Sequence, residues 1–311
     1  MTAKITDVAV AIFEKPDGRF LLSSRPEGKP YPHYWEFPGG KIEPGEDVYA
    51  ALVRELIEEL NVTITHATPW FAFIMRYTHA MVRLHCWRVQ AWQGNMRGME
   101  GQHFEWQSIG ALTVSPTLPG CVPIFAALRL PRVYAITNAG FKGVAAYRED
   151  LAHALQAGVK LIQVREKNMS PAELRAFARD VVSEAHSHGA KVLINSDAAT
   201  AADVGADGVH LTAAQLAACT SRPDFPLVAA STHTRAEIER AGELGLDFVV
   251  LGPVNETLTH PDQVPIGWPR FGEIINATPV PVFALGGLAL SDMTHAIESG
   301  AHGIAAQRAF S

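Results

Sequence analysis

Two patterns of apolar and polar residues divide this chain near residue 130. Before that point, segments 7–13, 19–24, 70–77 and 81–92 are rich in apolar, aromatic and β-branched residues and are predicted to be β-strands. The Pro16-Asp17-Gly18 turn predicts that the first two strands form a hairpin. Helices are predicted within 39–62 and at about 122–130. This mixed order of strands and helices predicts an α+β sandwich over residues 1–130.

Beyond Pro131 the pattern changes to short, wholly apolar segments that alternate with alanine-rich amphipathic helices. The predicted strands are residues 133–136, 161–165, 192–195, 208–211, 227–231, 248–251, 282–285 and 303–306. Wholly apolar strands are typical of a parallel sheet that helices cover, and eight of them predict an α/β fold, a (β/α)8 TIM barrel, over residues 131–311. In that fold, ligands bind at the carboxyl ends of the strands.

The helix within 39–62 has two distinct faces. One is an apolar stripe that we expect to pack against a sheet, formed by Leu52, Val53, Leu56, Ile57 and Leu60. Asn61 tolerates a left-handed backbone and is predicted to end the helix.

The other face carries Glu55, Glu58 and Glu59 at the spacing i, i+3 and i+4, which brings three carboxylates together. Like charges this close repel one another unless a cation lies between them. Mg2+ prefers such oxygen ligands and completes its shell with water and substrate phosphates. We therefore predict a Mg2+ site, for which Mn2+ can substitute. The alternative is a solvated helix that is simply rich in glutamate.

Composition and charge narrow the classes of partner. A chain of 311 residues is predicted to form about two domains. A formal net charge of −6 argues against binding to a nucleic acid polymer, because phosphate contacts need clustered Lys and Arg.

The cysteines Cys86, Cys121 and Cys219 are few and unclustered, which favours a reducing, cytoplasmic location. No signal peptide or membrane span is found, so no membrane partner is expected.

The glutamate helix and the segment before it resemble a known family. The pattern G-x5-E-x7-R-E-L-x-E-E is similar to the Nudix box of nucleoside-diphosphate-linked hydrolases, and here it consists of Gly40, Glu46, Arg54, Glu55, Leu56, Glu58 and Glu59. Asn61 stands where that family usually has glycine. The resemblance implies hydrolysis of a pyrophosphate linkage.

Within that family, the chain most resembles the MutT-type 8-oxo-dGTP diphosphatases. The likeness rests on the box, on Trp35-Glu36-Phe37-Pro38-Gly39-Gly40-Lys41-Ile42-Glu43 and on Glu100-Gly101-Gln102. It implies that the metal ligands are the Gly39 carbonyl, Glu55, Glu58, Glu59 and Glu100. It also implies substrate contacts at Arg25, Phe37, Lys41 and Cys121, with Arg25 helping to hold the base.

The resemblance also implies roles in catalysis for Glu55, Glu58, Glu59 and Arg54. Glu55 is the candidate that orients or deprotonates the attacking water, and Glu58 and Glu59 are mainly ligands. Arg54 either orients these ligands or touches the substrate. Cys121 stands where the family has a base-reading Asn, and a thiol cannot reproduce the two-way hydrogen bonding of an amide.

Polar residues at the ends of the predicted barrel strands carry a second resemblance, to thiamine phosphate synthase and its TenI-like relatives. It rests on segments 163–167, 205–211, 251–254 and 284–287. The candidate residues for a thiamine-related phosphate ligand are Gln163, Arg165, Lys167, Asn195, Gly286 and Gly287.

The barrel departs from the synthase pattern at its metal-binding positions. Ser196 replaces one aspartate, with Asp197 one place later, Gln215 lies near the position of the second, and His260 replaces a lysine. Loss of both carboxylates should cripple a reaction that needs Mg2+ on a diphosphate. The barrel is therefore a degenerate phosphate- or thiazole-binding module, an active synthase or a structural partner, and the sequence leaves all three open.

These observations predict a Mg2+-dependent hydrolase that converts a nucleoside triphosphate, an oxidised purine dNTP such as 8-oxo-dGTP, to the monophosphate and pyrophosphate. Its implied role is to remove mutagenic nucleotides from the precursor pool. A diphosphate of thiamine metabolism is a second candidate substrate. The sequence is also compatible with a bifunctional enzyme that has synthase activity as well, and with a barrel that acts as a ligand sensor or scaffold.

Overall fold

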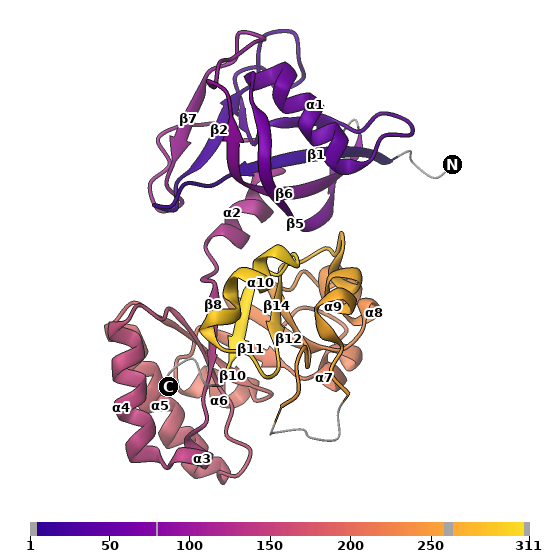
Figure 1. Cartoon of the computed structure of the whole chain (residues 1–311). Coiled ribbons are helices and arrows are strands. Elements are labelled where there is room, and N and C mark those ends of the chain that lie inside the picture. The colour runs from indigo at the N-terminus through magenta and orange to yellow at the C-terminus, as the bar shows by residue number, and fades with distance from the viewer. Residues whose placement is uncertain (1–4, 79, 258–263, 308–311) are drawn as a thin grey trace. The chain divides into compact units, whose positions relative to one another are not determined.

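The computed structural model describes residues 5–78, 80–257 and 264–307. The chain forms two compact units, Met1–Arg129 and Leu130–Ser311, and Figure 1 labels many of their elements. Within the described residues, none of the helices combines the length and the apolar character that a membrane crossing would require.

The first unit is built on two sheets. A four-stranded sheet has the order β4-β1-β6-β5 and a three-stranded sheet has the order β3-β2-β7. The strands are β1 (Ile5–Phe13), β2 (Phe20–Ser24), β3 (Trp35–Glu36), β4 (Gly39–Lys41), β5 (Thr63–Arg76), β6 (Met81–Gln93) and β7 (Phe104–Gln107). The helices are α1 (Val48–Leu60) and α2 (Cys121–Leu128).

Strand β1 separates the two hydrophobic clusters of this unit. Its residues Ala9, Ala11 and Phe13 pack in one cluster with Leu52, Leu56 and Leu60 of α1. Its alternate residues Val10 and Ile12 pack in the other cluster with Ile124 and Phe125 of α2. Because side chains alternate across a strand, β1 is apolar on both faces and has a helix on each side. The predicted α+β sandwich is confirmed.

The predicted hairpin of the first two strands is wrong. The turn after β1 forms, since Gly18 N–H donates to the Lys15 carbonyl over 2.9 Å, but antiparallel pairing stops at the single bridge between Glu14 and Phe20. Beyond it, β1 pairs with β4 and β6, and β2 pairs with β3 and β7. The turn depends on residues that are neighbours in the sequence, whereas the rest of the sheet determines which strands pair with one another.

Two further expectations in this unit need correction. Ile57 is 45% exposed and does not join the apolar stripe. The buried residues of the stripe are Ala51, Leu52, Leu56 and Leu60, and Val53 packs partly buried against the same cluster, as predicted. Strand β5 begins at Thr63, seven residues before the predicted start at residue 70. Pro69 disfavours a strand but is accommodated here next to a shift in the register between β5 and β6.

The second unit is a closed barrel of parallel strands in the order β8-β9-β10-β11-β12-β13-β14-β15. The strands are β8 (Val133–Ile136), β9 (Leu161–Val164), β10 (Lys191–Asn195), β11 (Gly208–Leu211), β12 (Leu227–Thr232), β13 (Phe248–Leu251), β14 (Val282–Leu285) and β15 (Gly303–Ala306). The helical elements are α3 (Ala139–Lys142), α4 (Val144–Gln156), α5 (Pro171–Ser187), α6 (Ala198–Asp203), α7 (Ala213–Ala218), α8 (Arg235–Glu243), α9 (Gly267–Ile275), η1 (Leu290–Asp292) and α10 (Met293–Glu298). The predicted (β/α)8 barrel is confirmed.

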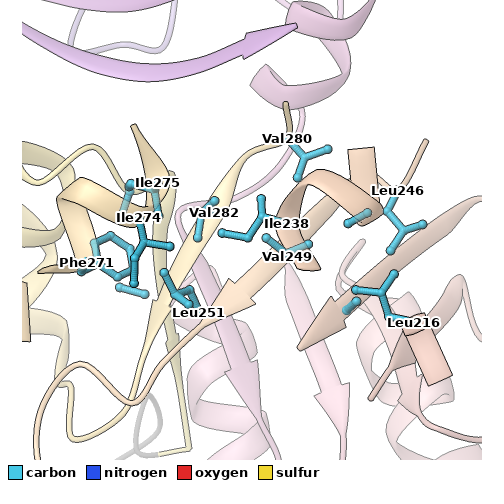
Figure 2. Packing of buried hydrophobic residues seen from close by; sticks show 14 of the residues in the cluster. Leu216, Ile238, Leu246, Val249, Leu251, Phe271, Ile274, Ile275, Val280 and Val282 are labelled. Atoms are coloured by element: carbon cyan, nitrogen blue, oxygen red, sulfur yellow. The ribbon is translucent and has the colours of Figure 1, made fainter. Parts of the chain in front are cut away.

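Apolar side chains fill the barrel on both faces of its strands. Inside, Tyr134 packs edge-on against Phe248, with ring centroids 5.1 Å apart, and Phe248 contacts Phe283 at 5.0 Å. Outside, Figure 2 shows Phe271 and Ile274 of α9 in the same cluster as residues of β13 and β14. This packing on both faces explains why these strands have no polar alternation.

Candidate functional site

Helix α1 positions the candidate carboxylates of the first unit. Asp47 caps its first turn, accepting hydrogen bonds from the backbone N–H groups of Tyr49 and Ala50 at 2.9 and 3.0 Å. Asn61 ends the helix in the left-handed region at φ 55°, as predicted. Three buried leucines anchor the opposite face, so the helix cannot rotate without exposing them.

Glu55 and Glu59 lie against the glycine pair that precedes the helix. A Cβ atom added to Gly40 would lie 2.1 Å from the Glu55 carboxylate, so only glycine leaves room for that side chain. Gly39 N–H donates to Glu59 Oε2 over 3.3 Å, and Gly39 has a φ of 139° that disfavours other residues. The motif glycines therefore bring the backbone up to these two carboxylates.

Arg54 forms ion pairs with three glutamates on or near this helix. Its Nε and Nη2 bind the two oxygens of Glu46 at 3.0 and 2.9 Å, and its Nη1 binds Glu55 at 2.9 Å. Nη1 also lies 3.3 Å from Glu58, and Nη2 donates to the Lys41 carbonyl at 3.0 Å. Hydrogen bonds to Glu46 and Glu55 raise the Arg54 pKa, so the guanidinium stays charged. These contacts support the role of orienting ligands.

The three glutamates differ in their surroundings. The side chains of Glu55 and Glu59 are mostly buried, whereas that of Glu58 is 58% exposed. Burial raises the pKa of Glu59 to about 7, and the Gly39 N–H and Lys29 only partly offset this. A carboxylate in such surroundings gains more from a bound cation than an exposed one does.

Glu100 approaches the end of α1 from a distant loop. The Gln102 side chain fixes this loop, because its Oε1 accepts from Glu100 N–H at 2.8 Å and its Nε2 donates to the Glu59 carbonyl at 2.9 Å. Lys29 Nζ lies 2.5 Å from Glu100 Oε2 and 3.8 Å from Glu59 Oε1. Sequence reasoning missed Lys29, because no spacing rule links it to residues 59 and 100.

The proposed substrate residues lie in different environments. Arg25 Nη1 binds both oxygens of Glu36 at 2.6 and 2.7 Å, a pairing that no local pattern predicted. Phe37 is buried and packs against Phe20 and Phe125. Lys41 is exposed.

Cys121 is buried at the start of α2, with its Sγ 3.7 Å from the Trp35 carbonyl. Burial raises the pKa of its thiol to about 12, so the thiol stays protonated and uncharged.

The oxygen donors of this site suit a hard divalent cation. Within the described ranges, no three His, Cys, Asp or Glu side chains already converge as a metal cluster. The buried Glu59 carboxylate with its raised pKa nevertheless fits a site that a cation completes. Glu55, Glu59 and Glu100 are the residues that would hold Mg2+, and Glu58 and the Gly39 carbonyl are further donors in the same segment.

In the second unit, all six candidate ligand residues line one cavity at the carboxyl ends of the strands. The cavity has a volume of about 630 Å3, and its lining includes Gln163, Arg165, Lys167, Asn195, Gly286 and Gly287. Gly286 and Gly287 have φ values of 108° and 63°, and a Cβ on Gly287 would lie 2.2 Å from the Glu256 carbonyl oxygen. Close packing against segment 253–256 therefore requires glycine at both positions.

A chain of hydrogen bonds through the buried Tyr134 links three residues of the cavity lining. Gln163 donates to the Tyr134 hydroxyl at 3.1 Å, and that hydroxyl lies 3.2 Å from His210 Nδ1. His210 Nε2 lies 2.9 Å from the Ser231 hydroxyl. Burial, together with the charge of Arg165, lowers the His210 pKa to about 3, so this imidazole is neutral.

The cavity combines two cationic side chains with few acidic ones. Burial lowers the pKa of Arg165, and the charge of Arg165 lowers the pKa of Lys167. Asp197 is not a lining residue of this cavity: its carboxylate caps α6 by accepting from Thr200 N–H at 2.8 Å and from the Thr200 hydroxyl at 2.6 Å. Gln215 donates to the Ser196 carbonyl at 2.8 Å. His260 lies outside the described residues.

Each of the two units matches a known protein family. The NUDIX domain model matches residues 4–120, and the model described as thiamine monophosphate synthase matches residues 133–310. The CTP pyrophosphohydrolase of Escherichia coli is 36% identical over 132 residues, which is 42% of this chain and 97% of that protein. The chain belongs to both families. It joins a NUDIX unit to a barrel of the thiamine monophosphate synthase family.

Two further relatives match one unit each. A protein of Aquifex aeolicus, provisionally named thiamine-phosphate synthase 2, is 34% identical over 181 residues, which is 57% of this chain and 96% of that protein. A solved MutT structure, from work on Aliivibrio salmonicida and Vibrio cholerae, is 29% identical and covers 40% of this chain and 97% of that chain, with a TM-score of 0.35. Both resemblances inferred from the sequence are confirmed at the level of the family.

Proposed function

We propose that the NUDIX unit hydrolyses a nucleoside triphosphate to the monophosphate and pyrophosphate with Mg2+. The observation that carries this proposal is the pair of mostly buried carboxylates, Glu55 and Glu59, held against Gly39 and Gly40. When bound, Mg2+ supplies positive charge that neutralises the phosphoanhydride oxygens and makes water a better nucleophile.

Side chains of this unit perform the proton transfer and position the reacting groups. Glu55 takes the proton of the attacking water as the new P–O bond forms and the phosphoanhydride bond between the α- and β-phosphates breaks, which releases the nucleoside monophosphate and pyrophosphate. Arg54 fixes the direction of that carboxylate through its 2.9 Å contact with Glu55 Oε1. The carboxylates of Glu46 and Glu58 bind Arg54 and hold it in place. Arg54 therefore acts by positioning Glu55.

We propose that 8-oxo-dGTP is one substrate of the NUDIX unit. The role of the enzyme would then be to remove oxidised nucleotides from the nucleotide pool. The resemblance of segment 35–43 to MutT-type enzymes supports it. The buried Cys121 thiol, however, cannot provide the paired donor and acceptor of an amide. CTP is therefore the second candidate, favoured by the name of the Escherichia coli relative.

A substrate panel tests these assignments. With Mg2+ present, release of pyrophosphate would be measured from 8-oxo-dGTP, dGTP and CTP, and release of orthophosphate from a thiamine-pathway diphosphate. We expect turnover of at least one nucleoside triphosphate, and turnover at least about 100-fold slower with the Glu55→Gln variant. Turnover confined to the thiamine-pathway diphosphate, or equal turnover by Glu55→Gln, would overturn the proposal.

For the barrel, we propose a binding site for a thiamine-related phosphate that does not perform the synthase reaction. Arg165, Lys167 and the backbone of Gly286 and Gly287 line the cavity and suit an anion. The carboxylate of Asp197 is engaged as a helix cap, and the Gln215 amide carries no negative charge to bind a metal.

Calorimetry with thiazole phosphate tests this binding site. We expect heat of binding that Arg165→Met abolishes, while Arg270→Met, an exposed arginine paired with Glu273, changes nothing. Absence of heat in the unmodified protein would favour a structural barrel, and synthase turnover would contradict the loss of catalysis.

A further inference from the structure

The ammonium group of Lys29 contacts two carboxylates that we assign to the metal site. Its Nζ lies 2.5 Å from Glu100 Oε2 and 3.8 Å from Glu59 Oε1. The three side chains come from an early loop, the last turn of α1 and a loop 71 residues after Lys29. Their meeting is therefore a property of the tertiary structure.

The groups around this contact are anchored. Arg25 Nε donates to the Pro30 carbonyl at 2.6 Å, and His33 N–H donates to the Arg25 carbonyl at 2.9 Å, which closes the loop that carries Lys29. On the other side, Gln102 ties the Glu100 backbone to α1. The Gly39 N–H still holds the Glu59 carboxylate and Gln102 still holds the Glu100 backbone when Lys29 moves. The lysine side chain, 42% exposed, has an open path to solvent.

A lysine and a divalent cation compete for these oxygens. Each would occupy the space that faces the same carboxylates, and two positive charges a few ångströms apart repel each other. We propose that Lys29 is an internal counter-ion that occupies the cation position of Glu59 and Glu100, and that a divalent metal displaces it. This inference rests on the proposed function, because it takes both glutamates as metal ligands.

Mn2+ binding to the full chain without nucleotide tests the proposal, with the free ion measured by electron paramagnetic resonance. Lys29→Met removes the competing charge and should tighten Mn2+ binding by about fivefold, as expected for the loss of a partly exposed ion pair and of a like charge. Lys29→Arg keeps a cation and should bind Mn2+ within about twofold of the unmodified protein. Lys15→Met is the matched control, since it removes the same charge from a side chain stacked on Trp106.

The outcomes separate this inference from the proposed function. If Lys29 only tethered the two loops, Lys29→Met would loosen Glu100 and weaken Mn2+ binding, which would overturn the counter-ion role. Unchanged affinity, or equal tightening by Lys15→Met, would overturn it as well. If the unmodified protein binds no Mn2+ and Lys29→Met binds none either, the metal site itself fails, and with it the proposed hydrolysis.

Discussion

At the scale of single residues, the candidate active site depends on differences between side chains of one type. Glu55, Glu58 and Glu59 lie within five positions of one helix, yet two are mostly buried and one is largely exposed. The spacing predicted that all three share a face. The structure shows that Glu55 and Glu59 meet the glycine pair, while Glu58 reaches solvent and pairs with Arg54.

Glu55→Gln should lower kcat for pyrophosphate release by at least about 100-fold, because an amide cannot accept the proton of the attacking water. The melting temperature should stay within a few degrees, since the amide oxygen can still accept from Arg54 and no apolar contact is lost. Steady-state kinetics and calorimetry measure the two effects. Glu58→Gln, at the exposed position, should cause a smaller loss, and the reverse order would contradict this assignment.

The buried His210 makes the barrel sensitive to acid. Its pKa is lowered to about 3, so the neutral imidazole stabilises the fold fully above its ordinary pKa of 6.5, and this contribution is lost as the pH falls from 6.5 towards 3. His210→Gln should therefore reduce the loss of barrel stability between pH 7.5 and 4.5 by about 3 kcal/mol. Urea unfolding at the two pH values measures it. His153→Gln, at an exposed position, is the control, and equal pH dependence in both variants would refute the prediction.

At the scale of elements, the ends of α1 decide where the carboxylates lie. The last turn carries Glu58 and Glu59, and Asn61 closes it with a left-handed backbone and with its N–H bonded to the Ile57 carbonyl at 3.0 Å. Capping residues act through bonds to their own neighbours, so this helix end could be predicted from the sequence. The β1–β2 hairpin could not, because distant strands compete for the same edges.

Asn61→Ala should destabilise the NUDIX unit by about 1 kcal/mol, because a Cβ without a local hydrogen-bonding group disfavours the left-handed conformation. Asn61→Gly should be neutral or slightly stabilising, since glycine adopts positive φ without strain. Chemical denaturation of the full chain compares the two. Equal destabilisation by both variants would show that the side chain, rather than the backbone conformation, is what matters.

At the scale of the whole molecule, each unit buries its own hydrophobic clusters. Leu52 is fully buried in the NUDIX unit, and Phe283 is fully buried in the barrel interior. Each core has the size of an ordinary domain and should unfold as one cooperative event.

Calorimetry of the full chain should therefore resolve two transitions. Leu52→Ala leaves a cavity and should lower the free energy of unfolding of the NUDIX unit by about 2 to 5 kcal/mol. Phe283→Ala should lower the free energy of unfolding of the barrel by about 3 to 5 kcal/mol. Each change should move the transition of its own unit to a lower temperature. Each variant should leave the remaining transition in place. A single transition that both variants shift equally would mean that the units unfold together.

The sequence by itself determined the fold class of each unit, the eight barrel strands to within a residue at each end, the left-handed end of the glutamate helix and both family memberships, but it did not predict β3, β4 and β7. These features depend on periodicity, turns and caps, which are interactions between neighbours along the chain. Only the tertiary structure decided that Glu59 is buried and Glu58 exposed, that Asp197 caps a helix, and that Lys29 meets Glu100. Burial and charge pairing depend on distance in space, and residues far apart in sequence set that distance.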